Sequence, residues 1–122
     1  MIRYKENKLI YSMVQRFHLD LGFGYVKVYI WKHREQLNAN IITDEEDVVA
    51  CYTPFPGRDP TEGFYGEMHF VDDEVKMSHI AHELIHLAFD LGEDGYTQEH
   101  VAHIIGNAFS VCMEEIFGID YL

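Results

Sequence analysis

Residues 82–86 read His-Glu-Leu-Ile-His, and this stretch constrains the chain more strongly than any other. Apolar residues recur around it at spacings of three and four, which predicts a helix. Histidines four residues apart lie on one face of a helix, so His82 and His86 could bind one Zn²⁺ ion. Glu83 lies one position round the helix, within reach of a zinc-activated water as general base. The spacing therefore predicts a zinc site with His82 and His86 as ligands and Glu83 as the catalytic residue.

A catalytic zinc usually has three protein ligands and keeps its fourth position open. Two candidates for the third ligand, Glu99 and His103, follow on the next predicted helix. The short link at 93–96 predicts that the two helices run antiparallel. The midpoint of the two histidines lies roughly 10 Å from the expected helix end at Leu91, with Glu99 about 3 Å and His103 about 9 Å into the next helix. A helix end two residues earlier would favour Glu99 by about 3 Å, so the spacing leaves both candidates open.

The chain has 122 residues, of which 48% are hydrophobic, so it is long enough for one domain with a buried core. We expect a single domain over residues 1–122. Its charged first residues lead into no long apolar run, so we expect neither a signal peptide nor a membrane span. Cys51 and Cys112 lie far apart without metal-binding spacing, and we expect both to be reduced thiols in a cytoplasmic protein.

The charge of the chain is strongly negative and unevenly distributed. The net charge is −12, from 9 Lys and Arg against 21 Asp and Glu, and no Lys or Arg follows Lys76. Residues 77–122 carry eight carboxylates: Glu83, Asp90, Glu93, Asp94, Glu99, Glu114, Glu115 and Asp120. Such a surface attracts cations and basic partners and repels phosphate backbones. We therefore expect a protein or peptide partner, a basic one in particular, and no direct binding of nucleic acid.

Hydrophobic periodicity and turn residues predict an α+β fold. An amphipathic helix is expected over 5–21, where apolar residues recur at spacings of three and four. Three strands are expected over 25–31, 48–52 and 66–71. The segment 32–47, with a short helical turn, and the proline-rich segment 53–63 would be loops.

Two further helices complete the predicted fold. Asp72 or Asp73 would cap the helix that carries residues 82–86, and Gly92 would end it. Thr97 would cap a last helix that reaches about Phe117. The predicted architecture is therefore an N-terminal helix, a small three-stranded sheet and two antiparallel helices that bear the ligands.

The H-E-x-x-H pattern of residues 82–86 and the following Glu99–Gly106 segment, an E-x-x-A-x-x-x-G pattern, resemble zincin-type, gluzincin-like metallopeptidases. The closest resemblance is to small phage-encoded metallopeptidase-like proteins, and a more distant one is to ImmA/IrrE-type peptidases. It covers roughly residues 66–110 and implies a minimal zincin-like domain. It also implies that His82, His86 and Glu99 bind zinc and that Glu83 is the base. The link before Glu99 is shorter than in that family, so His103 remains the alternative third ligand.

The resemblance also implies supporting parts around the site. Substrate peptide would lie along an edge strand before the motif helix, here Gly66, Glu67, Met68, His69 and Phe70. Ala102 and Gly106 would be small so that the last two helices approach closely. From the residues themselves, Asp90 could orient a ligand histidine or be a solvated residue. His79, Tyr96, Tyr65 and His69 could donate to an oxyanion, although a structural role is the more common one for each.

The sequence predicts a zinc-dependent metallopeptidase that hydrolyses an amide bond in a specific protein or peptide partner. Two other classes of function fit the same residues. One is a catalytically inactive metal-binding interaction module. The other is an acidic inhibitor of phage type that imitates nucleic acid, in which the metal is structural or absent. Metal content separates the last class from the other two.

Overall fold

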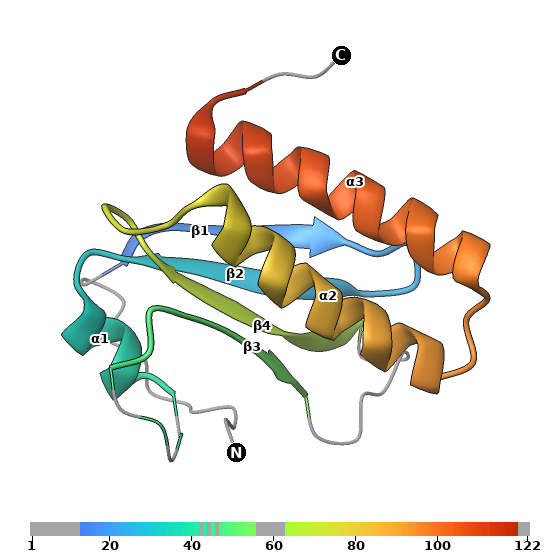
Figure 1. Cartoon of the computed structure of the whole chain (residues 1–122), viewed down its shortest axis with the longest axis horizontal. Coiled ribbons are helices and arrows are strands. Elements are labelled where there is room, and N and C mark those ends of the chain that lie inside the picture. The colour runs from blue at the N-terminus through green and yellow to red at the C-terminus, as the bar shows by residue number, and fades with distance from the viewer. Residues whose placement is uncertain (1–12, 42, 44, 46, 56–62, 120–122) are drawn as a thin grey trace.

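The computed structural model describes residues 13–41, 43, 45, 47–55 and 63–119, which form an α+β fold (Figure 1). The strands are β1 (Met13–Asp20), β2 (Tyr25–Trp31), β3 (Ala50–Pro54) and β4 (Phe64–Val71). The helices are α1 (Arg34–Ala39), α2 (Met77–Glu93) and α3 (Gln98–Phe117). The α+β class, the three expected strands, the helical turn after β2 and the last two helices are therefore confirmed.

The strands form one mixed sheet in the order β1-β2-β4-β3. β1 and β2 pair antiparallel, β2 and β4 pair parallel, and β3 and β4 pair antiparallel. The predicted three-stranded sheet with an N-terminal helix is wrong, because residues 13–20 form the outer strand β1. The first part of that predicted helix, residues 5–12, lies outside the described residues.

The error over residues 13–20 has a physical cause in the side-chain pattern. Exposure alternates along β1, so that Gln15, Phe17 and Leu19 turn toward the protein while Arg16 and His18 face solvent. This period of two is the strand pattern, but the neighbouring apolar residues also match a helical period. Pairing with β2 decides between them, because it satisfies the backbone hydrogen bonds and buries Leu19 completely.

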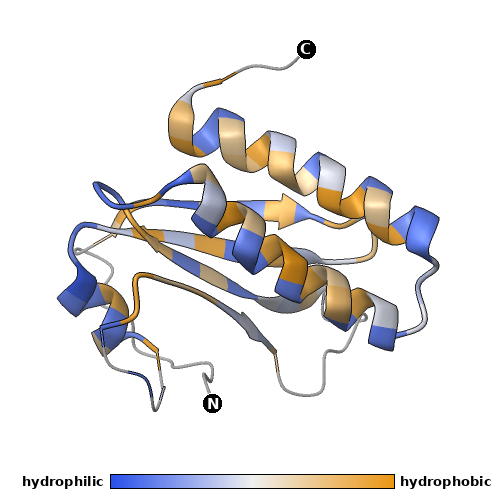
Figure 2. Cartoon of the chain, in the orientation of Figure 1, coloured by the Kyte–Doolittle hydropathy of each residue, from blue (hydrophilic) through white to orange (hydrophobic). Residues whose placement is uncertain are grey.

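The sheet separates two apolar clusters. α2 and α3 lie on one face, where their apolar residues pack on the strands (Figures 1 and 2). The buried residues of α2 are Ile80, Glu83, Leu84, Leu87 and Leu91. α1 packs on the opposite face, where Leu37 joins a smaller cluster with Trp31 and Val71. The rotation of α2 about its own axis is therefore set by the side chains that it buries against the sheet.

The helix ends differ from the predicted ones by a few residues. α2 begins after Lys76 rather than after Asp72 or Asp73, and it runs past Gly92 to Glu93. The α3 cap is confirmed: the backbone N–H of His100 donates to Thr97 Oγ1 at 3.2 Å. None of the helices in the described part of the chain is long and apolar enough to span a membrane.

Two glycines provide a matched test of the packing. A Cβ at Gly66 in β4 would lie 2.7 Å from the Thr53 carbonyl oxygen, whereas one at Gly106 in α3 would meet nothing within 4 Å. We expect Gly66→Ala to lower the free energy of unfolding by about 1–3 kcal/mol, because the backbone of β3 or β4 would have to shift to make room for the methyl group. Gly106→Ala should raise it by up to about 1 kcal/mol through helix propensity. Urea unfolding followed by circular dichroism measures both, and a stable Gly66→Ala variant would contradict the strand pairing.

Candidate metal and catalytic site

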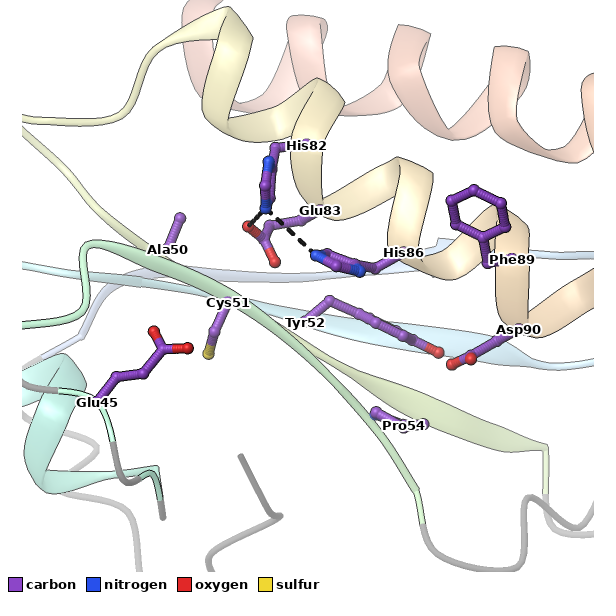
Figure 3. A pocket seen from close by; sticks show the side chains of 10 residues that line it. All are labelled: Glu45, Ala50, Cys51, Tyr52, Pro54, His82, Glu83, His86, Phe89 and Asp90. Carbon is purple, nitrogen blue, oxygen red and sulfur yellow. Dashed lines mark hydrogen bonds and ion pairs between the residues drawn. The ribbon is translucent and has the colours of Figure 1, made fainter. Parts of the chain in front are cut away.

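A pocket of about 380 Å³ lies between α2 and β3 and contains the histidine motif (Figure 3). We call it the histidine pocket. It is lined by Glu45, Ala50, Cys51, Tyr52, Pro54, His82, Glu83, His86, Phe89 and Asp90. Five of these residues come from α2, and the other five come from β3 and the segment before it. The pocket therefore brings the motif into contact with residues that precede it by about thirty positions.

The two motif histidines point their ring nitrogens at each other. His82 Nε2 and His86 Nε2 lie 3.2 Å apart, and the ring centroids are 4.9 Å apart with planes at 73°. Two nitrogens on a tetrahedral zinc, each about 2.0–2.1 Å from the ion, are separated by about 3.3 Å. The histidine pair therefore has the spacing of two ligands on one zinc ion.

Glu83 lies beneath the histidines and is 5% exposed. Its Oε2 is 3.9 Å from His82 Nε2. Burial raises the pKa of the Glu83 carboxyl, and nearby Glu45 raises it further. The histidines and a hydrogen bond from the Tyr52 backbone N–H act in the opposite direction. A carboxylate with a raised pKa is a stronger base, which suits proton transfer from water.

β3 and the segment before it form the opposite wall of the pocket. Cys51 is 1% exposed, and burial raises the pKa of its thiol far above the usual range. Without a metal the thiol therefore stays protonated, which disfavours it as a nucleophile. Glu45 lines the pocket across from the histidines, and Asp90 lines it one turn after His86 (Figure 3). Sequence spacing did not indicate Glu45, because its position depends on how the segment before β3 folds back.

The structure does not bring the candidate third ligands to the histidine pair. Glu99 and His103 lie on the exposed side of α3, with side chains 85% and 75% exposed, and they pair with each other at 3.3 Å. Within the part of the chain that the structure describes, no group of three His, Cys, Asp or Glu side chains could hold a metal ion. Among the described residues, His82 and His86 therefore converge as two metal ligands would, and no third His, Cys, Asp or Glu side chain completes the group in this arrangement.

The orientation of α2 explains this separation. The flank that carries Ile85 and Ala88 faces α3, where Val101 and Ala102 form the other side of a shared groove. The histidines lie on the other flank, toward β3 (Figure 3). Gly106 does not bring the helices together as expected, since a Cβ there would contact nothing within 4 Å.

The predicted substrate strand is not an edge strand. Gly66, Glu67, Met68, His69 and Phe70 belong to β4, which pairs with β2 on one side and β3 on the other. An interior strand has no free backbone groups for a peptide, so this prediction is wrong. β3 is the outer strand next to the histidine pocket.

The other candidates have structural contacts of their own. His79 Nδ1 accepts a hydrogen bond from the Lys76 backbone N–H at 3.1 Å and so helps to cap α2. Tyr96 stacks on Phe23 with centroids 4.7 Å apart. The Tyr65 hydroxyl donates to Asp94. Of the supporting candidates, the structure places Asp90 in the histidine pocket and His79, Tyr96 and Tyr65 outside its lining.

A second polar cluster lies inside the sheet, on the face opposite α2. Trp31 Nε1–H donates to His69 Nδ1 at 2.9 Å, so His69 Nε2 carries the proton that faces Glu67 Oε1 at 2.8 Å. All three residues are almost fully buried. Their hydrogen bonds offset part of the cost of burying polar groups, which indicates that His69 has a structural role.

The burial of Glu83 makes a prediction about stability and pH. Because its folded-state pKa is raised, ionisation of Glu83 destabilises the fold as pH rises above the ordinary carboxyl range. We expect Glu83→Gln to stabilise the metal-free protein at pH 8, with a gain that disappears near pH 4. Thermal unfolding in EDTA at several pH values measures this difference. Glu114→Gln, at an exposed position of α3, is the control and should show no such trend. A Glu83→Gln variant that is less stable than the unmutated protein at every pH would contradict the raised pKa of Glu83.

Comparisons with known proteins add no family to these observations. No protein-family model matches the chain, and neither does any curated protein or solved structure. The resemblance to zincin-type peptidases stays a prediction from the motif. The arguments below therefore start from the histidine pair, Glu83 and the surfaces beside them.

Proposed function

We propose that the protein is a zinc-dependent hydrolase that cleaves an amide bond in a protein or peptide partner. The observation that carries this proposal is the 3.2 Å separation of His82 Nε2 and His86 Nε2 above the buried carboxylate of Glu83. Two exposed imidazoles that converge in this way suit a shared cation. Free, buried Cys51 and Cys112 suit a cytoplasmic location.

The chain's own residues would divide the work as follows. His82 and His86 hold the metal, and zinc, when bound, supplies Lewis acidity that polarises a carbonyl and lowers the pKa of water. Glu83 accepts a proton from the attacking water and passes it to the leaving amine. Its burial excludes solvent on one side, and the Tyr52 backbone N–H holds its carboxylate in place.

We propose Glu45 as the third ligand. It lines the same pocket from the side opposite the histidines, whereas Asp90 lies further along α2. Glu45 contributes to the raised pKa of Glu83, after burial, and its side chain would have to move toward the histidines to share a metal with them. A cation between Glu45 and the histidines would relieve the repulsion between the two carboxylates.

The substrate would be an extended peptide beside β3. This strand forms the wall of the histidine pocket and is the outer strand of the sheet on that side. Extended peptides commonly bind at such strands through backbone hydrogen bonds. Ala50, Tyr52 and Pro54 would then contact the peptide beside the histidine pair.

Metal analysis tests the site. Protein purified without added metal should contain about one zinc ion per chain, and His82→Ala or His86→Ala should remove it, because a single imidazole cannot hold the ion. Elemental analysis gives the stoichiometry, and unfolding scans confirm that each variant is folded. His100→Ala, at an exposed position on α3, is the matched control and should keep the metal.

The third ligand is tested by the same measurement with a competing chelator. Glu45→Gln should weaken zinc binding at least about tenfold, and Glu99→Gln should leave it unchanged. If Glu99→Gln weakens zinc binding and Glu45→Gln does not, Glu99 is the third ligand, as the resemblance implies. A zinc content near zero in the unmutated protein would end the hydrolase proposal and favour an acidic inhibitor.

Cleavage tests the chemistry separately from metal binding. Glu83→Gln should retain zinc and reduce peptide cleavage about 10²–10⁴-fold, because it removes the general base and leaves both histidines in place. Product formation from a mixed peptide library, followed by mass spectrometry, measures the loss, and Glu114→Gln is the control. Zinc binding without any cleavage by the unmutated protein would instead indicate an interaction module.

A further inference from the structure

An apolar groove runs between α2 and α3, on the flank of α2 that faces α3. Its volume is about 640 Å³. It is lined by Ile85, Ala88, Phe89, Gly92, Glu93, Tyr96, Gln98, Val101, Ala102 and Ile105. Most of these side chains are apolar, so the groove is a hydrophobic surface that the two helices leave uncovered in the described structure.

Two large side chains of the groove are unusually exposed. Phe89 is 70% exposed and Ile85 is 54% exposed, and they lie one turn apart on α2. Figure 2 shows apolar residues along both helices, alternating with polar ones. Burying such side chains against another protein is favourable, because it removes apolar surface from water. A contiguous set of such residues is characteristic of a surface that binds another protein.

The charge around the groove selects the kind of partner. Glu93 lines the groove, and Glu99, 85% exposed, follows Gln98 at its edge. No Lys or Arg occurs after Lys76, so neither helix contributes a positive charge. An apolar groove with an acidic border is complementary to a helix whose apolar face is flanked by Lys and Arg.

The dimensions of the groove also suit a helix. The lining residues extend over 85–93 in α2 and 98–105 in α3, which is about two turns, or about 12 Å, of each. A partner helix would place residues i, i+3 or i+4, and i+7 along this length. Helix packing against two parallel ridges of side chains is a common arrangement.

A second copy of this chain fits less well as the occupant. It would bring another net charge of −12, and another acidic helix pair, against the same border.

We infer that this groove binds a basic amphipathic helix of a partner protein. Phe89 lines both the groove and the histidine pocket, so the bound helix lies next to the proposed site of hydrolysis. The partner is thereby held beside the histidine pair, as a specific substrate or its carrier would be. The binding itself requires no metal, so it stands or falls independently of the proposed hydrolase activity.

The test uses a fluorescein-labelled amphipathic peptide of about five turns, with Leu at i, i+4 and i+7 and Lys or Arg beside them. Fluorescence anisotropy with the full chain in EDTA should show saturable binding that weakens as NaCl rises. A matched peptide with Glu in place of Lys and Arg should bind at least about tenfold more weakly. His82→Ala should bind the basic peptide normally.

Substitutions in the protein test whether the peptide binds in the groove. Ile85→Asp should weaken binding at least about tenfold, because it places a carboxylate in the apolar groove. Val14→Asp is the matched control, since Val14 in β1 is 51% exposed and lies outside the groove, and it should bind normally.

Five results would overturn the inference. The first three are absence of binding, equal binding of the acidic peptide, and equal affinity of Ile85→Asp. The fourth is tighter binding of a synthetic peptide of residues 1–12. The fifth is a dimer, seen in sedimentation and disrupted by Ile85→Asp, which would identify a second copy as the occupant.

Discussion

Burial of one side of α2 against the sheet controls the rest of the structure. Ile80, Leu84, Leu87 and Leu91 are completely or almost completely buried, so the helix cannot rotate about its axis without exposing them. The orientation of α2 that results directs His82 and His86 toward β3 and directs Ile85 toward α3. The histidine pocket and the apolar groove are therefore two consequences of the same packed face. Each flank of one helix carries its own surface.

Glu83 connects that packing to the proposed chemistry. It lies between the buried stripe of α2 and the exposed histidines, so its carboxylate is desolvated while the imidazoles remain accessible. Desolvation disfavours the charged form, which makes the carboxylate a better proton acceptor at the expense of stability. The Tyr52 backbone N–H limits that cost. A functional group that destabilises its own fold is common in catalytic sites.

Sequence periodicity predicted some elements better than others. The two last helices and the strands at 25–31 and 66–71 have strong local patterns, and the structure contains all of them within a few residues. Residues 13–20 carry apolar side chains that match both a helical and a strand period, and pairing with β2 selects the strand. The order of strands in the sheet has no local signature, which is why 66–70 was expected at an edge and lies in the interior.

The amino-acid sequence was sufficient to place His82, Glu83 and His86 together, because residues separated by one helical turn are neighbours wherever the helix packs. It could not identify what faces them. Glu45, Cys51 and Tyr52 line the same pocket as the histidines through the path of the chain around β3, whereas Glu99 lies on the exposed side of α3. Those relations depend on long-range burial and strand pairing, whose free energy is spread over the whole core rather than contained in any one segment.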